Sequence, residues 1–282
     1  MDRRYFMAAG GCALTTACME GAAGAGGRPV STNNVRVLDQ REVGPDRSYG
    51  YRRIADPTGT APTASVERFE LRGGDCHRGD CIARELNGRM VTRGRVEQMY
   101  GLDVGEGDDF VYSYSVYFPS DRYQWATGVG ATYGQVLFRP VRRSDEESRP
   151  IWSLDTDRST DRRRFYTAMV EAEDSEGATD TKRYREATQG GFASAAMPMD
   201  RWINFTVYTR LSSDPSRGFI RATRNGTPAG QLTGRTMTPG GGVEIRYGIY
   251  MTGTNQHAGG AGNIPTQVVY YAGVSFQRTS FA

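Results

Sequence analysis

An arginine and a tyrosine stand four residues apart, at Arg246 and Tyr250, in the alternating segment 243–250. Side chains alternate between the two faces of a strand, so both belong to one face and apolar residues occupy the other. A tyrosine can give or take a proton if its pKa falls from about 10, and the charge of Arg246 would lower it. Gly248, between them, leaves room for a ligand. The segment predicts the floor of a binding site; the alternative is an ordinary outer strand.

A second row of charge occurs at Arg93, Arg95 and Glu97, which the period of two again places on one strand face. A guanidinium binds a carboxylate as a planar fork, so Arg95 is a candidate group for holding an anionic substrate. We assign Arg93 and Glu97 to substrate binding, with Glu97 orienting the arginines. The alternative is an ion pair across the face that has no part in binding.

A third strand is predicted for residues 132–139, with Tyr133, Gln135, Leu137 and Arg139 on one face. The amide of Gln135 can donate a hydrogen bond to a carboxylate or to the negative charge that develops on it during a reaction. Tyr133 and Arg139 are expected to contact the same ligand. The alternative for Gln135 is an ordinary polar residue of a strand.

The composition indicates a β protein with a large core. The 282 residues include 38% hydrophobic side chains, 36 glycines and 16 tyrosines, whereas long helix-forming runs are missing. About a dozen alternating segments separated by turn residues predict a concanavalin-like two-sheet antiparallel β-sandwich, or jelly roll, with long loops. The net charge of +3 is too small to indicate a nucleic-acid partner, and we expect a monomer.

The four cysteines fall into two pairs, and only one pair lies beyond the N-terminal leader. Cys76 and Cys81 are separated by five positions in a segment rich in glycine and aspartate, where they could form a loop disulfide or half of a metal site. A metal site would need further ligands that the sequence does not group together. We therefore predict a disulfide, an oxidising compartment, and neither a metal nor another cofactor.

The first 18 residues predict an export signal. Arg3 and Arg4 form a twin-arginine pair, followed by a weakly apolar stretch rich in alanine and glycine. Cys18 ends a partial lipoprotein cleavage box, so the alternatives are a lipid anchor on Cys18 or removal of the leader by a signal peptidase. Residues 19–34 are expected to form a flexible linker, and 35–282 the folded domain.

This leader places the expected product outside the cytoplasm of a bacterium. The protein would be periplasmic, extracellular, or held at the outer membrane as a lipoprotein. A lipid on Cys18 would be its one attachment to a membrane, because the apolar stretch of the leader is too short and too weak to span one.

The order of these segments resembles that of the jelly-roll polysaccharide lyases related to heparin lyase I and glucuronan lyase, and more distantly that of the jelly-roll alginate lyases. The family's Arg-x-Arg-x-Glu element matches residues 93–97. Its Gln-x-His element matches residues 135–137, with Leu137 in place of the histidine. The lysine and tyrosine of the alginate lyases' late strand correspond to Arg246 and Tyr250.

The resemblance implies that an acidic, uronate-containing polysaccharide binds on a concave sheet face and is cleaved by β-elimination. The reaction must neutralise the uronate carboxylate, remove the proton on C5 and protonate the leaving O4. Arg95 and Gln135 meet the first demand, and Tyr250 can transfer protons. Without the family histidine, either Tyr250 is both base and acid, or His257 in the following loop supplies an imidazole. A loop histidine that contacts only solvent is the alternative for His257.

Two other functions stay open on these residues. A non-catalytic carbohydrate-binding protein could keep the binding face after losing the histidine, which Leu137 replaces. A glycoside hydrolase on the same sandwich would need two carboxylates across the glycosidic bond. The sequence has no strand with the Glu-x-Asp-x-x-Glu spacing of such enzymes, so the hydrolase is the weaker of the two.

Overall fold

The computed structural model describes residues 30–31, 34–86, 88–139, 149–156, 164–169, 185–186, 195–237 and 239–281. The predicted export signal and most of the predicted linker lie outside these residues. No helix in this part of the chain is long and apolar enough to cross a membrane.

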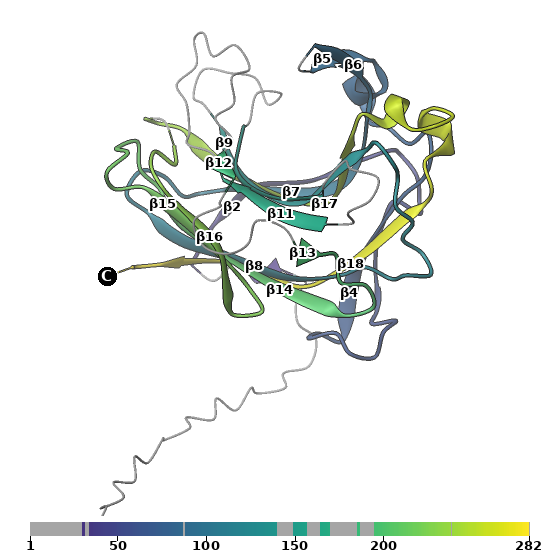
Figure 1. The fold of residues 1–282 in the computed structure, drawn as a ribbon. Helices are drawn as coiled ribbons and strands as arrows, with labels where there is room; N and C mark the ends of the chain where they lie inside the picture. Colours follow the sequence, from purple (N-terminus) through teal and green to yellow (C-terminus); the bar gives the residue numbers. More distant parts are fainter. Residues whose placement is uncertain are drawn as a thin grey trace, which may run out of the picture.

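Two antiparallel sheets stack face to face, one above the other in Figure 1. The first sheet has the order β16 (Thr227–Thr233), β15 (Phe219–Arg224), β14 (Trp202–Arg210), β8 (Asp109–Tyr117), β18 (Gln267–Thr279), β4 (Ser65–Leu71) and β3 (Tyr51–Ala55). The second sheet has the order β12 (Arg185–Glu186), β11 (Arg164–Met169), β10 (Arg149–Thr156), β9 (Gly130–Arg139), β17 (Gly242–Thr252), β7 (Arg93–Leu102) and β2 (Val37–Val43). β13 (Ala195–Ala196) also pairs with β11. The expected two-sheet sandwich is confirmed.

One short strand lies in the stretch that we expected to be linker. β1 (Val30–Ser31) pairs in parallel with Val274 and Ser275 of β18, in the first sheet. Val35, close behind it, is buried in the core. The first sheet therefore includes two residues from before position 35.

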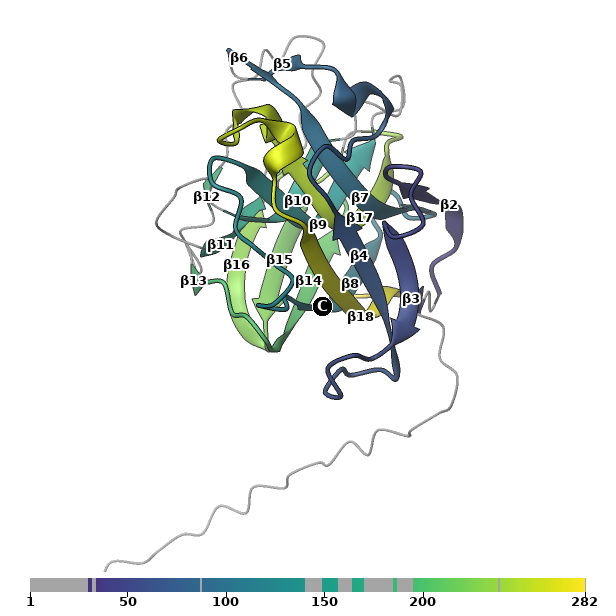
Figure 2. The ribbon, with the colours of Figure 1, turned by 90° about the vertical axis from the view of Figure 1, so that its right-hand side faces the viewer.

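A hairpin and three short 3-10 turns stand beyond one end of the second sheet, as Figures 1 and 2 show. They are β5 (Arg84–Leu86), β6 (Arg89–Val91), η1 (Arg78–Cys81), η3 (Thr254–Gln256) and η4 (Ala261–Asn263). Thr92, directly after β6, ties the hairpin to η3, because its hydroxyl shares a hydrogen bond of 2.7 Å with that of Thr254.

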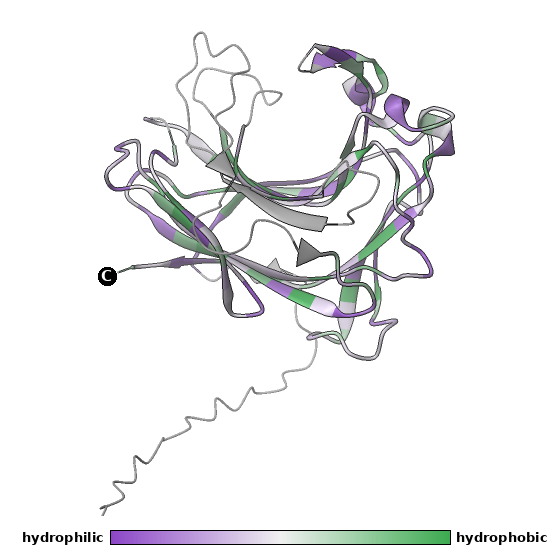
Figure 3. Cartoon of the chain, viewed as in Figure 1, coloured by the Kyte–Doolittle hydropathy of each residue, from purple (hydrophilic) through white to green (hydrophobic). Residues whose placement is uncertain are grey.

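The core between the sheets is rich in aromatic rings. Figure 3 shows hydrophobic residues interleaved with hydrophilic ones along the strands. Phe69 of β4 packs edge-on against Tyr271 of β18, with ring centroids 5.3 Å apart. It also contacts Tyr247 of β17 at 5.7 Å, and so joins the two sheets. Such pairs add about 0.5–1.5 kcal/mol each beyond the area that they bury.

One carboxylate lies inside this core. Glu67 of β4 is 2% exposed, and it accepts hydrogen bonds from the hydroxyls of Tyr51 at 2.7 Å and Tyr247 at 2.9 Å. Burial raises the pKa of Glu67, although the two tyrosine hydrogen bonds oppose the rise. Because Tyr247 belongs to β17, this network couples the interior to the strand that carries Tyr250.

Candidate active site

The three predicted strands are neighbours in the second sheet, in the order β9, β17, β7. On β17, Tyr250 lies opposite Arg95 of β7, and Arg246 lies opposite Gln135 of β9. The alternate residues of the same strands, such as Ile249, are in the core. The sheet register thus brings residues from three distant segments onto one surface. We call this surface the site face: the side of β9, β17 and β7 turned away from the first sheet, which is concave in Figure 1.

Arg95 is held between two carboxylates on the site face. Its Nε lies 2.5 Å from Oδ2 of Asp80, and its Nη2 donates to Oδ1 of Asp80 at 3.0 Å. Its Nη1 lies 3.6 Å from Oε2 of Glu97, the neighbour that we expected to orient it. The charge of Arg95 is therefore balanced by protein groups before any substrate arrives.

Tyr250 lies against this guanidinium, whose Cζ is 4.6 Å from the centroid of the phenol ring. Burial raises the pKa of Tyr250, while the positive charges of Arg95 and Arg93 lower it by less. The expectation of a pKa lowered by Arg246 is wrong, because burial prevails and the nearby cations belong to β7. Tyr250 is thus a neutral phenol near pH 7, which can donate a proton.

Arg246 has a different partner from the one predicted. Its Nε donates to Oε1 of Glu244 at 2.5 Å, two residues away on the same strand face. Glu244 is fully buried, so this pair is desolvated on one side. Glu97 is also buried, and burial raises the pKa of its carboxyl even though Arg95 and Arg246 act against the rise.

Gly248 serves the packing of the strands and not the entry of a ligand. Its φ is +136°, and a Cβ at this position would lie 2.3 Å from the carbonyl oxygen of Val96. Only glycine fits such a close approach of backbone to backbone. The pairing of β17 with β9 also shifts register here, between Tyr247 and Tyr250. The expectation that Gly248 leaves room for a ligand is therefore wrong.

Gln135 lies on the site face at 9% exposure, between Arg246 on one side and Ser153 of β10 on the other. Leu137, where the family has histidine, is only 3% exposed and lies opposite Glu244. It therefore presents almost no surface to a ligand.

Tyr133 is in the core and not on the site face. It is fully buried, its ring lies edge-on to Phe118 at 4.9 Å, and its hydroxyl bonds to that of Tyr123. The pairing of β9 with β10 shifts register between the partners of Thr132 and Gly134, which breaks the strict alternation. The prediction that Tyr133 contacts the ligand is wrong for this reason. Arg139 is the last residue of β9, and its side chain lies outside the described part of the chain.

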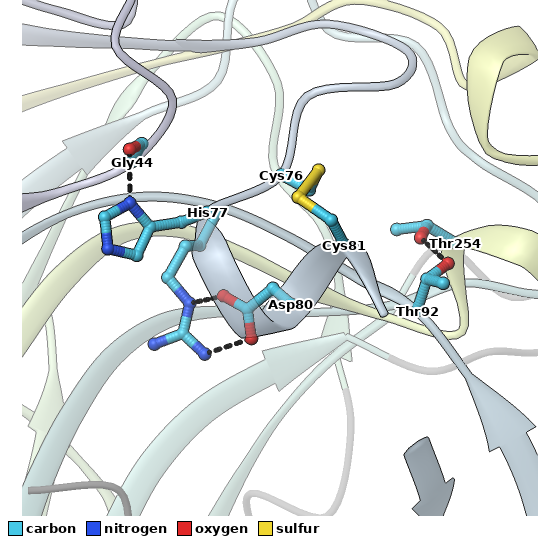
Figure 4. Close-up of a disulfide and its surroundings, with 8 residues drawn as sticks. Gly44, Cys76, His77, Asp80, Cys81, Thr92 and Thr254 are labelled. Carbon is cyan, nitrogen blue, oxygen red and sulfur yellow. Dashed lines mark hydrogen bonds and ion pairs between the residues drawn. A yellow bond between two sulfur atoms is a disulfide. The ribbon is translucent and has the colours of Figure 1, made fainter. Parts of the chain in front are cut away.

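The predicted disulfide between Cys76 and Cys81 is confirmed. Figure 4 shows that the loop it closes carries Asp80. The carboxylate of Asp80 accepts a hydrogen bond from Arg95. Asp80 is 8% exposed, and sequence reasoning missed it as a site residue. Its place beside Cys81 was the available signal, because a short closed loop next to a strand fixes the direction of each of its side chains.

A family model described as polysaccharide lyase matches residues 32–275. The chain belongs to this family of polysaccharide lyases. No curated protein matches the sequence of the lyase.

Solved structures share the lyase's jelly-roll fold. An endo-β-1,4-glucuronan lyase from the fungus Trichoderma reesei has a TM-score of 0.57 at 11% identity, covering 88% of this chain and 94% of that one. An alginate lyase from Pseudomonas aeruginosa has a TM-score of 0.50 at 12% identity, covering 83% and 87%. An alginate lyase solved with an alginate trisaccharide has a TM-score of 0.50 at 15% identity, covering 85% and 88%. At these identities the likeness is one of fold.

His257 of the lyase lies just after η3, at the end of the sheet where Tyr250 is found. Its Nδ1 is 3.0 Å from the carbonyl oxygen of Thr127. Because a carbonyl only accepts hydrogen bonds, Nδ1 carries the hydrogen, and in the neutral imidazole Nε2 is then the nitrogen with a lone pair. No hydrogen bond joins His257 to Tyr250 in the described part of the chain.

Arg93 lies farther from Asp80 than Arg95 does. Its Nη1 is 4.0 Å from Oδ1 of Asp80, and its Nε is buried without a hydrogen-bond partner among the described residues. A buried donor left unpaired costs about 1–3 kcal/mol, so a ligand acceptor at this point would be favoured. Among the residues that the structure describes, no group of three or more His, Cys, Asp or Glu side chains is placed to hold a metal ion.

Proposed function

We propose that this lyase cleaves a uronate-containing polysaccharide by β-elimination on the site face. The observation that carries the proposal is the neutral phenol of Tyr250, whose ring centroid lies 4.6 Å from the guanidinium of Arg95: a half-buried proton donor beside fixed positive charge. Two structures of the same fold are named as glucuronan and alginate lyases, and both polymers consist of uronates.

The uronate carboxylate is bound by side chains whose hydrogen-bond donors are not all used within the protein. Arg95 is already paired with Asp80 and Glu97, so it fixes the local charge. Arg93, whose Nε has no hydrogen-bond partner among the described residues, and the amide of Gln135 donate to the carboxylate. A charged hydrogen bond of this kind contributes about 1.5–3 kcal/mol, and it strengthens as negative charge develops on the carboxylate.

Proton transfer is divided between two residues. The raised pKa of Tyr250 makes it the acid that protonates the leaving O4. The Nε2 lone pair of His257 takes the proton from C5, in place of the histidine that Leu137 replaces. The C5 proton leaves as the C4–O4 bond breaks, and the electron pair becomes the C4–C5 double bond. The phenolate left on Tyr250 and the imidazolium left on His257 then exchange a proton through water.

A panel of polymers tests the proposal. We expect glucuronan or alginate, incubated with the lyase, to give a rise in the ultraviolet absorbance of unsaturated uronate ends, with heparin and hyaluronan as further members of the panel. Binding to one of these polymers without any rise in absorbance would contradict the proposal. That outcome would support a non-catalytic carbohydrate-binding protein, in which the buried Leu137 marks the loss of the base.

Replacing His257 with alanine should lower kcat by about 10²–10⁴-fold, the usual contribution of a general base. The measurement is initial rate on the polymer that the panel identifies. Asn255→Ala is the matched control, because Asn255 belongs to the same loop but bonds to the backbone of Thr92 and Met90. If His257→Ala keeps full activity, Tyr250 performs both proton transfers and our assignment of the base is wrong.

We also propose that the lyase is exported. The disulfide between Cys76 and Cys81 supports this, because such bonds persist in oxidising compartments. The leader with its twin-arginine pair supports it as well. Fractionation of the native host, with detection of the protein outside the cytoplasm, tests the proposal.

A further inference from the structure

The acidic group closest to Arg95 comes from outside the sheet. Asp80 belongs to η1, and its two oxygens lie 2.5 Å and 3.0 Å from Nε and Nη2 of Arg95. Asp80 is buried, so its charge is poorly screened by solvent. A carboxylate that faces two nitrogens of one guanidinium fixes the plane of that group as well as its position.

The plane of the guanidinium matters because the phenol ring of Tyr250 rests on it. Arg95 Cζ lies 4.6 Å from the centroid of that ring. Glu97, on the other side, is more distant from Arg95 at 3.6 Å and approaches only Nη1. Without Asp80, the guanidinium would lose the two contacts that hold it flat beneath the ring. Only the longer contact of Nη1 with Glu97 would remain, and it does not fix the orientation of the guanidinium under the ring.

The loop that delivers Asp80 has little structure of its own. η1 is four residues long, and within it the backbone N–H of Asp80 donates to His77 at 2.9 Å. The disulfide between Cys76 and Cys81 closes the loop directly beside Asp80. At the other end, Nδ1 of His77 lies 2.6 Å from the carbonyl oxygen of Gly44, as Figure 4 shows. The loop is thus tied at two points, and one of them is covalent.

We propose that Asp80 is a positioning residue of the site, and that the disulfide next to it keeps it against Arg95. This rests on the function proposed above. The core of the sandwich does not include the loop, so the bond is required for turnover and not for the folded sheets. Reduction by dithiothreitol breaks the S–S bond: the dithiol supplies two electrons and two protons, becomes a cyclic disulfide, and leaves two thiols that no longer hold the loop.

Asp80→Asn is the first variant, because asparagine keeps the size of the side chain and removes its charge. We expect kcat to fall by about 10- to 100-fold with KM within about threefold, as for a misplaced catalytic group. Asp75→Asn is the matched control: it removes a carboxylate directly before the loop, one that accepts hydrogen bonds from Tyr49 and from the backbone N–H of Arg72. The control should keep kcat within about twofold.

The alkaline limb of the pH profile separates positioning from a general loss of structure. The charged groups that act on Tyr250 are Arg93, Arg95 and Glu97 of β7 and Asp80 of η1, and the two carboxylates raise its pKa. Removing the charge of Asp80 therefore lowers the pKa of Tyr250, and the alkaline limb of kcat/KM should move to lower pH. A profile and a kcat equal to those of the wild type would overturn the proposal.

The disulfide is tested in the same assay. Cys76→Ser with Cys81→Ser, or the wild type kept in dithiothreitol, should show the same loss of kcat and the same shift of the limb. Adding Asp80→Asn to the double serine variant should cause no further loss of kcat, because both changes remove the same contact between Asp80 and Arg95. Losses that multiply would contradict the proposed link between the bond and Asp80.

Failure of the proposed function is distinguishable from failure of this inference. If no polymer is cleaved, the pKa of Tyr250 is still measured by ultraviolet titration of its phenol, as the difference between each protein and its Tyr250→Phe counterpart. A lower pKa in Asp80→Asn, and in the reduced protein, supports the positioning role without turnover. An unchanged pKa overturns it.

Discussion

Replacing Tyr250 with phenylalanine should lower kcat by about 10²–10⁴-fold and leave polymer binding within about threefold. The change removes one hydroxyl and keeps the ring that lies over Arg95. Binding depends on other residues of the site face, whereas protonation of the leaving oxygen depends on this hydroxyl. Initial rates and equilibrium binding of the same polymer separate the two effects.

The matched control is Tyr208→Phe. Tyr208 is a half-buried tyrosine of β14 in the first sheet, where its ring packs against Phe281 at 5.9 Å. We expect no loss of turnover from it. In the wild type, the activity should persist to a pH above the ordinary pKa of a tyrosine, because burial raises that of Tyr250 and the acid stays protonated. Full turnover by Tyr250→Phe would rule out our choice of acid.

Replacing Glu67 with alanine should lower the free energy of unfolding by about 2–6 kcal/mol. The hydroxyls of Tyr51 and Tyr247 both donate to this carboxylate, and each unpaired buried group costs about 1–3 kcal/mol. The alanine also leaves a cavity where the sheets meet. Urea unfolding followed by tryptophan fluorescence gives the free energy.

Glu67→Gln is the informative control, because it keeps the shape and an acceptor for the tyrosines. In the wild type the pKa of Glu67 is raised by burial. Between the ordinary glutamate pKa and this raised value, the folded state keeps a proton that the unfolded state has lost. Stability is therefore complete below the ordinary value and falls as the pH rises through the window. Glu67→Gln should remove that fall, and an identical pH dependence in both proteins would contradict the assignment.

Side-chain alternation predicts the two-sheet fold and the face of each strand on which the site residues lie, whereas the meeting of the three site strands was implied by the resemblance to the lyases. Arg95, Tyr250 and Gln135 each stand in a regular alternating segment, and the sheet register sets the three side by side. The disulfide was predictable for another reason. Cys76 and Cys81 had only each other as partners once the leader was set aside.

The predictions about the site were wrong or incomplete where the alternation of a strand breaks, or where a contact with a distant segment determines the role of a residue. A register shift in the pairing of β9 with β10 places Tyr133 in the core, and no turn residue in the sequence indicates that shift. The pKa of Tyr250 depends on burial, which a single strand cannot show. Asp80 was not predicted as a site residue because a loop closed by a disulfide, and not the alternation of a strand, places it beside Arg95. The pairing of Arg246 with Glu244, in contrast, was within reach of the sequence, since residues two apart on a strand share a face.

The parallel pairing of Val30 and Ser31 with β18 decides which way the lyase would face on a support. The chain enters the domain on the first sheet, whereas Tyr250 and its neighbours belong to the second. A protein immobilised through its N-terminal segment would therefore turn the site face outward. A long polymer could then bind across the site face without contacting the point of attachment. The N-terminal end is therefore the suitable one for immobilising the lyase on a bead or an electrode.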